Sequence, residues 1–280
     1  MTVPLTVPPN TDAPAGPREQ PRPEDRRPLG DRRVLRAVAR WTLAAAVCGG
    51  LGAATACGLT ALDRTDVPGL ATADDGRWDF GALKLPALPA GAPRPFTAGN
   101  DGQIHHADAR DLLLPAPAGA KGDPELTGGW VPDSRYVTEY DEDGRADITT
   151  GLRDYVVRHI AARGWTMPDG TSTRIYLLTF ESNAFAQAFK DNVIRTGIDA
   201  GQPPADAPLM ELDESWDGRG APKELSESVF AEQEPYGATQ ARTASVVAGD
   251  TLAVITERRK GGAPAVPFHQ TLVLQSQLLG

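Results

Sequence analysis

Cysteine is almost absent from this chain of 280 residues, and its two cysteines, Cys48 and Cys57, lie in one apolar run. Everything after residue 62 therefore has no cysteine, cannot form a disulfide and must be held together by a hydrophobic core. Lysine is also scarce, since five Lys stand against twenty-three Arg, while Ala, Gly and Pro are abundant. GC-rich codons produce this bias, which indicates a high-GC bacterium as the source.

The sequence also lacks the common motifs of catalysis and cofactor binding. No G-x-S-x-G, H-E-x-x-H or P-loop pattern occurs, and isolated polar residues do not indicate a site without a geometry that organises them. We therefore assign no catalytic, cofactor-binding or metal-binding residue from the sequence. The chain is expected not to be an enzyme and to need no cofactor.

The uncharged, largely apolar run at residues 41–62 is the most informative segment of the chain. It is long enough for a helix that crosses a bilayer, which needs roughly 20 apolar residues. Six arginines lie between residues 26 and 40, and Asp63 and Asp66 follow the run. Excess Arg keeps its flank in the cytoplasm. This pattern predicts a single-pass membrane protein with a cytoplasmic N-terminus and residues 63–280 outside.

The processing of this segment is open. Ala54-Thr55-Ala56-Cys57 resembles a lipobox, in which Cys57 would be lipidated, although Ala54 replaces the usual Leu, Val or Ile. Arg32-Arg33-Val34-Leu35 resembles a twin-arginine export signal, with Arg36 where an apolar residue is expected. The run is longer than the apolar core of a signal peptide. An uncleaved transmembrane anchor therefore fits best, with a lipoprotein and a cleaved signal as alternatives.

Composition divides the chain into a leader, an anchor, a tether and a domain. Residues 1–40 form a basic cytoplasmic leader, predicted to be disordered because its first part is rich in Pro and poor in large apolar residues. Residues 63–100 are again Pro-rich and predict a tether, although Trp78 and Phe80 could dock on the domain. Residues 101–280 suit one extracytoplasmic domain.

The charge of these parts limits the partners. Residues 1–62 carry eight basic and five acidic side chains. The remaining residues carry twenty basic and thirty-two acidic side chains, so their net charge is −12. An acidic exterior argues against nucleic acid and against docking on anionic lipid. The expected contacts are membrane lipid through residues 41–62 and an envelope protein or a cell-wall component outside.

Helical periodicity predicts three helices in the domain. The first runs from Asp147 to Arg163, where apolar residues recur at helical spacing: Ile148, Leu152, Tyr155, Val156 and Ile160. Ser182 can cap a second helix whose apolar side carries Phe185, Ala188, Phe189 and Val193. Pro267 can open the last helix, which carries Phe268, Leu272 and Leu279.

Two patterns predict strands. Residues 173–180 are β-rich and apolar on both faces, which is typical of a central strand. Gly249-Asp250 separates two β-rich runs at 241–248 and 251–258, as in a hairpin. Residues 200–235 predict a long surface loop with one or two short strands. The order of elements predicts an α+β domain with a mainly antiparallel sheet and packed helices.

Two acidic segments have spacings related to calcium-binding loops. Asp213, Ser215, Asp217 and Glu224 follow the oxygen spacing of such a loop, but Gly220 stands at its apolar eighth position and Pro222 interrupts it. The segment around Asp141, from Glu139 to Thr150, is a poorer copy, because Thr150 occupies the bidentate position. Solvated acidic turns explain both segments better, so we expect no tight calcium site.

Histidines offer a second set of metal-ligand types. His105 and His106, with Asp108 and Asp111, place nitrogen and oxygen ligands close together. Adjacent histidines cannot both face one ion from a regular helix, and no distant ligand completes the set. We interpret them as surface residues that open a short helix. His159 is interpreted as a boundary residue of the helix from Asp147.

Several short strings support a resemblance. They are RTDVPGLAT (64–72), DGRW (75–78), LLLPAPAGA (112–120), RHIAARGWTMPDGT (158–171) and LQSQLLG (274–280). With them, the chain resembles a group of Streptomyces-type (actinobacterial) membrane-anchored secreted proteins of unknown function. The resemblance implies a basic leader, one apolar segment and an external domain. It implies no catalytic or binding residue.

Three classes of function remain open. A binding, sensing or interaction module at the outer membrane face fits a tethered acidic domain without motifs best. A structural accessory subunit of an envelope complex would show a large exposed apolar patch. An enzyme with an unrecognised site would show a deep pocket with convergent carboxylates or histidines.

Overall fold

The protein is represented by a computed structural model that describes residues 32–61, 75–194 and 201–280. The chain divides into two units, Met1–Thr72 and Ala73–Gly280. Residues 1–31 of the predicted leader, residue 62 of the apolar run and residues 63–74 of the predicted tether lie outside the described residues. Residues 32–40 of the leader, which were predicted to be disordered, are instead helical.

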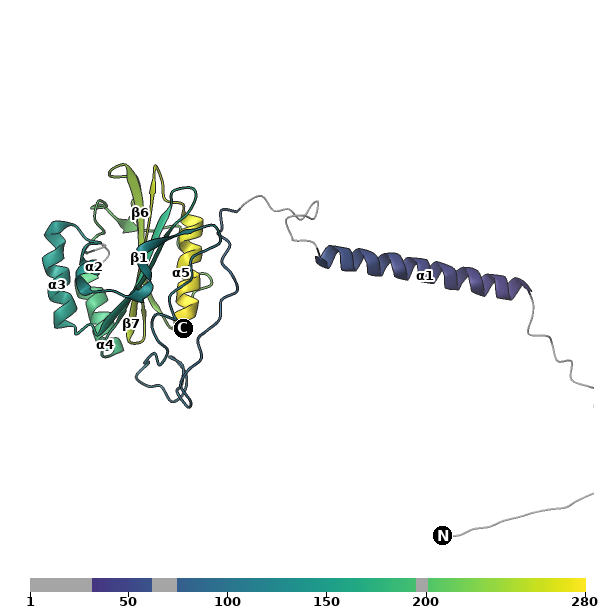
Figure 1. Ribbon diagram of the computed structural model, residues 1–280, viewed down its shortest axis with the longest axis horizontal. Helices are drawn as coiled ribbons and strands as arrows, with labels where there is room; N and C mark the ends of the chain where they lie inside the picture. The colour runs from purple at the N-terminus through teal and green to yellow at the C-terminus, as the bar shows by residue number, and fades with distance from the viewer. Residues whose placement is uncertain (1–31, 62–74, 195–200) are drawn as a thin grey trace, which may run out of the picture. The chain divides into compact units, whose positions relative to one another are not determined.

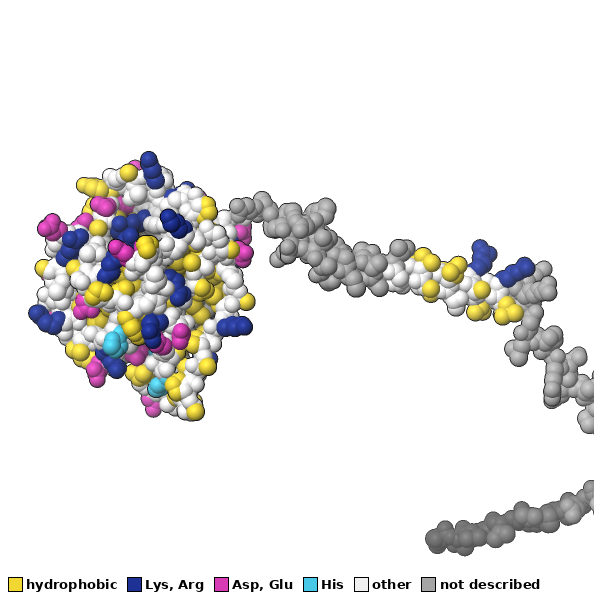
Figure 2. Space-filling model, in the orientation of Figure 1, with side chains coloured by type: hydrophobic (Ala, Val, Ile, Leu, Met, Phe, Trp, Pro, Cys, Tyr) yellow, Lys and Arg dark blue, Asp and Glu magenta, His cyan; other side chains and the backbone are white. Residues whose placement is uncertain are grey.

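The first unit contains the helix α1 (Arg32–Ala61), which includes almost all of the apolar run at residues 41–62. Large apolar side chains on it are exposed, among them Leu35, Trp41 and Leu43. Figure 2 shows basic side chains close together near one end of this helix. Within the described residues, no helix combines the length and the apolar character that a membrane crossing requires.

The second unit is built on one antiparallel sheet of seven strands in the order β1-β2-β3-β7-β6-β5-β4 (Figure 1). The prediction of an α+β domain with an antiparallel sheet is therefore confirmed. The strands are β1 (Lys121–Trp130), β2 (His159–Thr166), β3 (Ser172–Thr179), β4 (Glu211–Leu212), β5 (Ser226–Ala231), β6 (Thr239–Ala248) and β7 (Thr251–Lys260).

Helices cover both faces of this sheet, as Figure 1 shows. On one face lie α2 (Asp133–Val137), α3 (Arg145–Asp154) and α4 (Asn183–Phe189), with a short 3-10 turn η1 (Glu142–Gly144) before α3. A π-helical turn, η2 (Lys190–Ile194), continues α4. The C-terminal helix α5 (Ala265–Leu279) lies on the opposite face.

Strand β3 shows how one sequence fills two cores. Side chains alternate between the faces of a strand, so Ile175 and Leu177 join the core under α5, while Tyr176 and Leu178 join the core under α2, α3 and α4. β3 is buried on both faces and pairs with β2 and β7. The predicted central strand at residues 173–180 is thus confirmed.

The predicted hairpin at Gly249-Asp250 is also confirmed, because Ala248 pairs with Thr251 at the end of β6 and β7. Gly249 has a positive φ of 55°, which most side chains avoid. A Cβ at this position would also overlap the carbonyl oxygen of Gln103. Glycine is therefore required here for both conformation and space.

The predicted helix from Asp147 to Arg163 is wrong in its second half. α3 ends at Asp154, and residues 159–166 form β2. The chain leaves the helix where the Val157 N–H donates to the Leu152 carbonyl and Val156 adopts a positive φ of 53°. Val156 is 49% exposed, while Ile160 is buried from the strand. The four-residue spacing of Leu152, Val156 and Ile160 therefore does not mark one helix, because Leu152 belongs to α3 and Ile160 to β2.

The other two predicted helices are close to the observed ones. α5 begins two residues before Pro267, and Phe268, Leu272 and Leu279 are buried as expected. α4 follows Ser182, whose side chain makes no capping hydrogen bond. Its buried residues are Ala186 and Phe189, whereas Phe185 is exposed. The expected apolar side of this helix was therefore partly wrong.

The described part of the predicted tether packs on the domain. Trp78 and Phe80 contact the core under α5. The Trp78 N–H donates to Gln270 Oε1 at 2.8 Å, and Gln270 Nε2 donates to the Trp78 carbonyl at 2.9 Å. These contacts place residues 75–100 in the domain instead of in an extended tether. The long loop predicted at residues 200–235 contains the two short strands β4 and β5, as expected.

Candidate functional site

An open cleft lies at the β4–β5 edge of the sheet. Its volume is about 530 Å³, within the range of roughly 300–1,000 Å³ that is typical of small-molecule sites. The turn after α4, the loop after β4 and the start of β5 form its walls. Six polar or aromatic residues dominate the lining: Lys190, Asp191, Asp213, Trp216, Ser226 and Glu227.

The shortness of β4 creates this cleft. β4 pairs with β5 only at Phe230 and Ala231, and the Asp213 N–H adds one bond to the Val229 carbonyl. Beyond Asp213 the chain leaves the sheet, so the first residues of β5 pair with β6 on one side and border the cleft on the other. The side chain of Asp213 explains this departure, because it is held by residues of β6 and α5.

Asp213 is the first residue of the predicted calcium-loop spacing, and its carboxylate is already occupied. Oδ2 accepts from Arg242 Nη1 at 2.6 Å and lies 2.9 Å from His269 Nε2, while Oδ1 accepts from Ser215. Burial alone would raise the pKa of Asp213, but the bonds from His269 and Ser215 and the charge of Arg242 hold it well below its usual value. This carboxylate is a structural anion.

Lys190 forms the opposite wall of the cleft. Its side chain is only 4% exposed, and its Nζ donates to Ser226 Oγ at 2.8 Å. The Asp191 carboxylate lies 3.9 Å from the same nitrogen. Lys190 is four residues after Ala186 and therefore continues the buried face of α4 into η2. A charged group thus reaches the cleft from a face that is otherwise apolar.

Glu227 and Trp216 complete the site. Ser276 Oγ donates to Glu227 Oε1 at 3.2 Å, and the Trp216 side chain also hydrogen-bonds to this carboxyl group. Burial raises the pKa of Glu227, although both hydrogen bonds and the charge of Lys190 oppose the shift. The Trp216 ring lies 5.1 Å from that of His269 on α5. The indole is therefore fixed from two sides.

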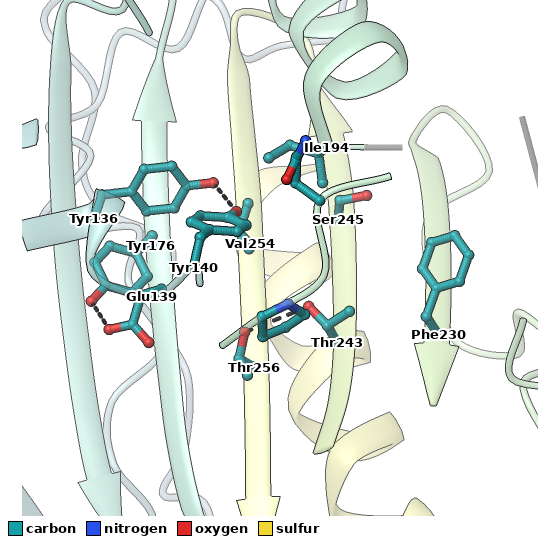
Figure 3. Close-up of a pocket in the computed structure, with 12 residues that line it drawn as sticks. Tyr136, Glu139, Tyr140, Tyr176, Ile194, Phe230, Thr243, Ser245, Val254 and Thr256 are labelled. Carbon is teal, nitrogen blue, oxygen red and sulfur yellow. Dashed lines mark hydrogen bonds between the residues drawn. The ribbon is translucent and has the colours of Figure 1, made fainter. Parts of the chain in front are cut away.

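A second, smaller cavity lies under α2 (Figure 3). Its volume is about 20 Å³, and a single water needs about 10–15 Å³. Figure 3 shows the Tyr136 and Tyr140 hydroxyls bonded to each other, at 2.6 Å, and the Tyr176 hydroxyl bonded to Glu139, also at 2.6 Å. Ser245 Oγ is buried without a hydrogen-bond partner among the described residues. This cavity suits one water, not a larger ligand.

Glu139, the first residue of the segment around Asp141, is likewise used inside the fold. It accepts from Arg135 Nη1 at 2.7 Å and from Arg174 Nη1 at 2.9 Å. Burial would raise the pKa of Glu139, but the bond from Tyr176 and the two arginines lower it more. Glu139 joins α2 to β3 and does not face solvent as a turn residue would.

The histidine prediction is wrong for His105. Its side chain is 5% exposed, with Nδ1 at 2.8 Å from Asp250 Oδ1 and Nε2 at 2.9 Å from the Leu279 carbonyl oxygen. It opens no helix and ties the hairpin turn to the end of α5. His106 is exposed, and Asp108 pairs with Arg110. His159 lies on β2 with its ring 5.1 Å from that of Trp130.

Within the described residues, no three His, Cys, Asp or Glu side chains are grouped so that they could hold a metal ion. No family model and no curated protein matches the sequence.

Sequence patterns did not identify the cleft residues. Asp213 was considered only because of its spacing to other acidic residues, and no sequence pattern indicated a role for Trp216. One signal was present, because Lys190 occupies a helix position four residues after the apolar Ala186. A lysine on the buried side of a helix needs polar partners there. Ser226 carries no such signal, since only the folded chain places it beside Lys190.

Proposed function

We propose that the chain is a single-pass membrane protein that holds a binding module outside the cytoplasm, with the cleft at the β4–β5 edge as the binding site. The apolar run at residues 41–62 and the arginines before it support the orientation. In this proposal the run is retained as an anchor and is neither cleaved nor lipidated at Cys57. The resemblance to Streptomyces-type membrane-anchored secreted proteins agrees with it.

The observation that carries the binding function is the preorganised polar lining of an open cleft. Lys190 and Glu227 are each held by a hydrogen bond to another element, at Ser226 and Ser276. Groups that are already fixed lose little freedom when a ligand binds. The volume of the cleft is sufficient for a small ligand or one unit of a polymer.

Binding explains this lining better than catalysis does. Two carboxyl groups with pKa values shifted apart are typical of acid–base pairs, and Glu227 and Asp213 are shifted in opposite directions. Asp213, however, is almost fully buried, accepts hydrogen bonds at both oxygens and has a lowered pKa, which makes it a weak base and leaves little of it open to a substrate. Lys190 and Ser226 resemble a Ser–Lys pair, but Lys190 Nζ donates to Ser226 Oγ, whereas a general base would have to accept the proton of that hydroxyl.

A structural accessory role is the second candidate and has less support. Such a subunit would need a contiguous apolar patch larger than a few hundred Å². The large exposed apolar residues of the domain lie on different elements, for example Trp130 on β1, Phe185 on α4 and Val266 on α5. Figure 2 shows acidic and basic side chains interspersed on the viewed face of the domain.

Photo-crosslinking in living cells tests the proposed function. In one protein a photoreactive amino acid replaces Leu212 on the rim of the cleft. In the control protein it replaces Val156, which lies in the turn between α3 and β2. The two positions are 44% and 49% exposed, so their access to solvent is similar. We expect a discrete adduct from position 212 and none from position 156. Equal adducts at both positions, or none at either, would contradict binding in the cleft.

A further inference from the structure

We propose that the cleft binds a pyranose ring of a neutral or amino sugar, an inference that rests on the proposed function and specifies its ligand. The ring would stack on Trp216 and exchange hydrogen bonds with the groups around Lys190 and Asp191. Two sources share this chemistry: a free sugar and a unit of a wall polysaccharide.

Trp216 provides the stacking surface. Its side chain lines the cleft and is half-buried. The hydrogen bond to Glu227 and the contact with the His269 ring hold the indole in one orientation. Tryptophan offers a large apolar area at a small cost in conformational entropy, together with a polar edge. The C–H face of a pyranose ring is apolar, and its rim is polar, so it matches such a surface.

The polar groups around Trp216 suit hydroxyl groups. A sugar hydroxyl both donates and accepts, so it is best bound where a donor and an acceptor lie side by side. The cleft offers two such pairs. Lys190 Nζ lies 2.8 Å from Ser226 Oγ, and Gln187 Nε2 lies 2.8 Å from Asp191 Oδ2. A sugar hydroxyl can insert into each of these bonds, where it would accept from the nitrogen and donate to the oxygen.

The charge of the cleft selects among sugars. Lys190 is the one cationic side chain among the described residues that line it, against the carboxyl groups of Asp191, Asp213 and Glu227. Arg242 neutralises Asp213 from outside the lining. The carboxyl groups of Asp191 and Glu227 still outnumber the one cation, and the part of the chain after residue 62 has a net charge of −12. Uronic acids and phosphorylated sugars would therefore be repelled.

An extended peptide fits the cleft less well. A strand added to a sheet edge relies on a row of free backbone groups, whereas β4 and Asp213 already cover β5 from Val229 onward. Only the short stretch Ser226–Ser228 remains beside the cleft. Stacking and side-chain hydrogen bonds are thus the stronger sources of affinity here.

Fluorine NMR of the full-length chain tests this proposal. Five tryptophans labelled with 5-fluorotryptophan give five resonances, each assigned by a Trp→Phe variant. The probes are a glucose oligomer, an N-acetylglucosamine oligomer, a galacturonate oligomer and a trialanine peptide. Co-sedimentation with isolated insoluble cell wall distinguishes a wall polysaccharide from a free sugar. Trp130 is the internal control, because it is exposed at the opposite edge of the sheet.

We expect the neutral or the amino sugar to shift the Trp216 resonance and leave that of Trp130 unchanged, with no effect of galacturonate. Gln187→Ala should weaken this binding about tenfold, as expected for one lost hydrogen bond, without a change in melting temperature. Trp130→Ala should bind normally.

Three results would overturn the inference. If trialanine shifted the Trp216 resonance and no sugar did, the cleft would still be a binding site but a sugar ligand would be refuted. A galacturonate affinity equal to that of the neutral sugars would refute the selection by charge. A sugar-induced shift of Trp130 or Trp78 without one of Trp216 would move the sugar site away from the cleft and would also count against the proposed function.

Discussion

The Lys190 ammonium and the Ser226 hydroxyl lie 2.8 Å apart, although 36 residues separate them in the sequence. This bond joins the π-helical turn after α4 to the first residue of β5 and closes one side of the cleft. π-Helical turns often lie at functional sites. The same lysine is almost inaccessible to solvent along its side chain, so its position depends on the packing of both elements.

Lys190→Met tests the role of this ammonium. Methionine has a similar length and adapts to irregular space, so the walls should stay packed while the charge is lost. Because removal of a buried charge relieves desolvation, the melting temperature should change little. Ligand affinity should fall by roughly tenfold to a hundredfold, the value of a hydrogen bond to a charged group. Calorimetric titration and thermal denaturation measure the two effects.

Lys223→Met is the matched control, because Lys223 is exposed and does not line the cleft. It should leave both quantities unchanged. Unchanged affinity in Lys190→Met would show that the ammonium does not contact the ligand.

Glu257→Gln should reveal a carboxyl group that is neutral in the folded protein. Burial raises the pKa of Glu257 to about 8, and neither the bond from Thr173 nor the charge of Arg242 offsets it. Since the folded pKa lies above the unfolded value of 4.5, stability falls as the pH rises between 4.5 and 8, by about 1.4 kcal/mol per pH unit. Glutamine cannot ionise, so the variant escapes this loss.

Melting curves at pH 5 and pH 8 measure the difference between the two proteins. Near pH 5 the variant and the wild type should melt within a degree or two, and at pH 8 the variant should melt higher by several degrees. Contributions from other groups cancel in this comparison. The same difference at both pH values would mean that Glu257 is ionised in the folded state.

His105→Ala should destabilise the domain, because the imidazole bridges Asp250 and the Leu279 carbonyl. Loss of hydrogen bonds to buried groups costs about 1–3 kcal/mol, equivalent to roughly 2–10 °C for a domain of this size. His106→Ala is the neighbouring control and should melt like the wild type, because His106 is exposed. Equal melting of all three proteins, measured by circular dichroism, would contradict the bridge.

Local patterns predicted the elements whose structure is set locally. β3 follows from an apolar run on both faces, the β6–β7 hairpin from Gly249, and α5 from its periodic leucines and Phe268. The helix from Asp147 failed because Leu152, Val156 and Ile160 have helical spacing but belong to a helix, a turn and a strand. The spacing of apolar residues alone does not show where a helix ends in a turn.

The cleft could not be predicted for a different reason. Its walls come from positions as far apart as Gln187 and Val229, and each polar side chain is fixed by a partner on another element. Asp213 looked like a loop ligand because Arg242 and His269 are distant in sequence. His105 looked like a surface residue for the same reason. Long-range partners decide whether such residues are buried.

Val156→Asn and Leu152→Ala together test the observed end of α3. Asparagine tolerates a positive φ better than the β-branched valine, so Val156→Asn should gain about 1 kcal/mol, or roughly 2–4 °C. Leu152 is buried, and Leu152→Ala should lose about 2–5 kcal/mol. In a continuous helix to Arg163 both changes would be destabilising. A lower melting temperature for Val156→Asn would therefore contradict the turn at Tyr155 and Val156.

Cysteine labelling on intact cells shows whether the cleft faces the outside and binds a ligand there. Leu212→Cys and Val156→Cys each receive a membrane-impermeant maleimide, with the wild type, whose own Cys48 and Cys57 lie in the apolar run, as the blank. We expect labelling of both variants without permeabilisation, and slower labelling of Leu212→Cys alone when a neutral or amino sugar oligomer is added. Labelling of both variants only after permeabilisation would contradict a binding site outside the cytoplasm.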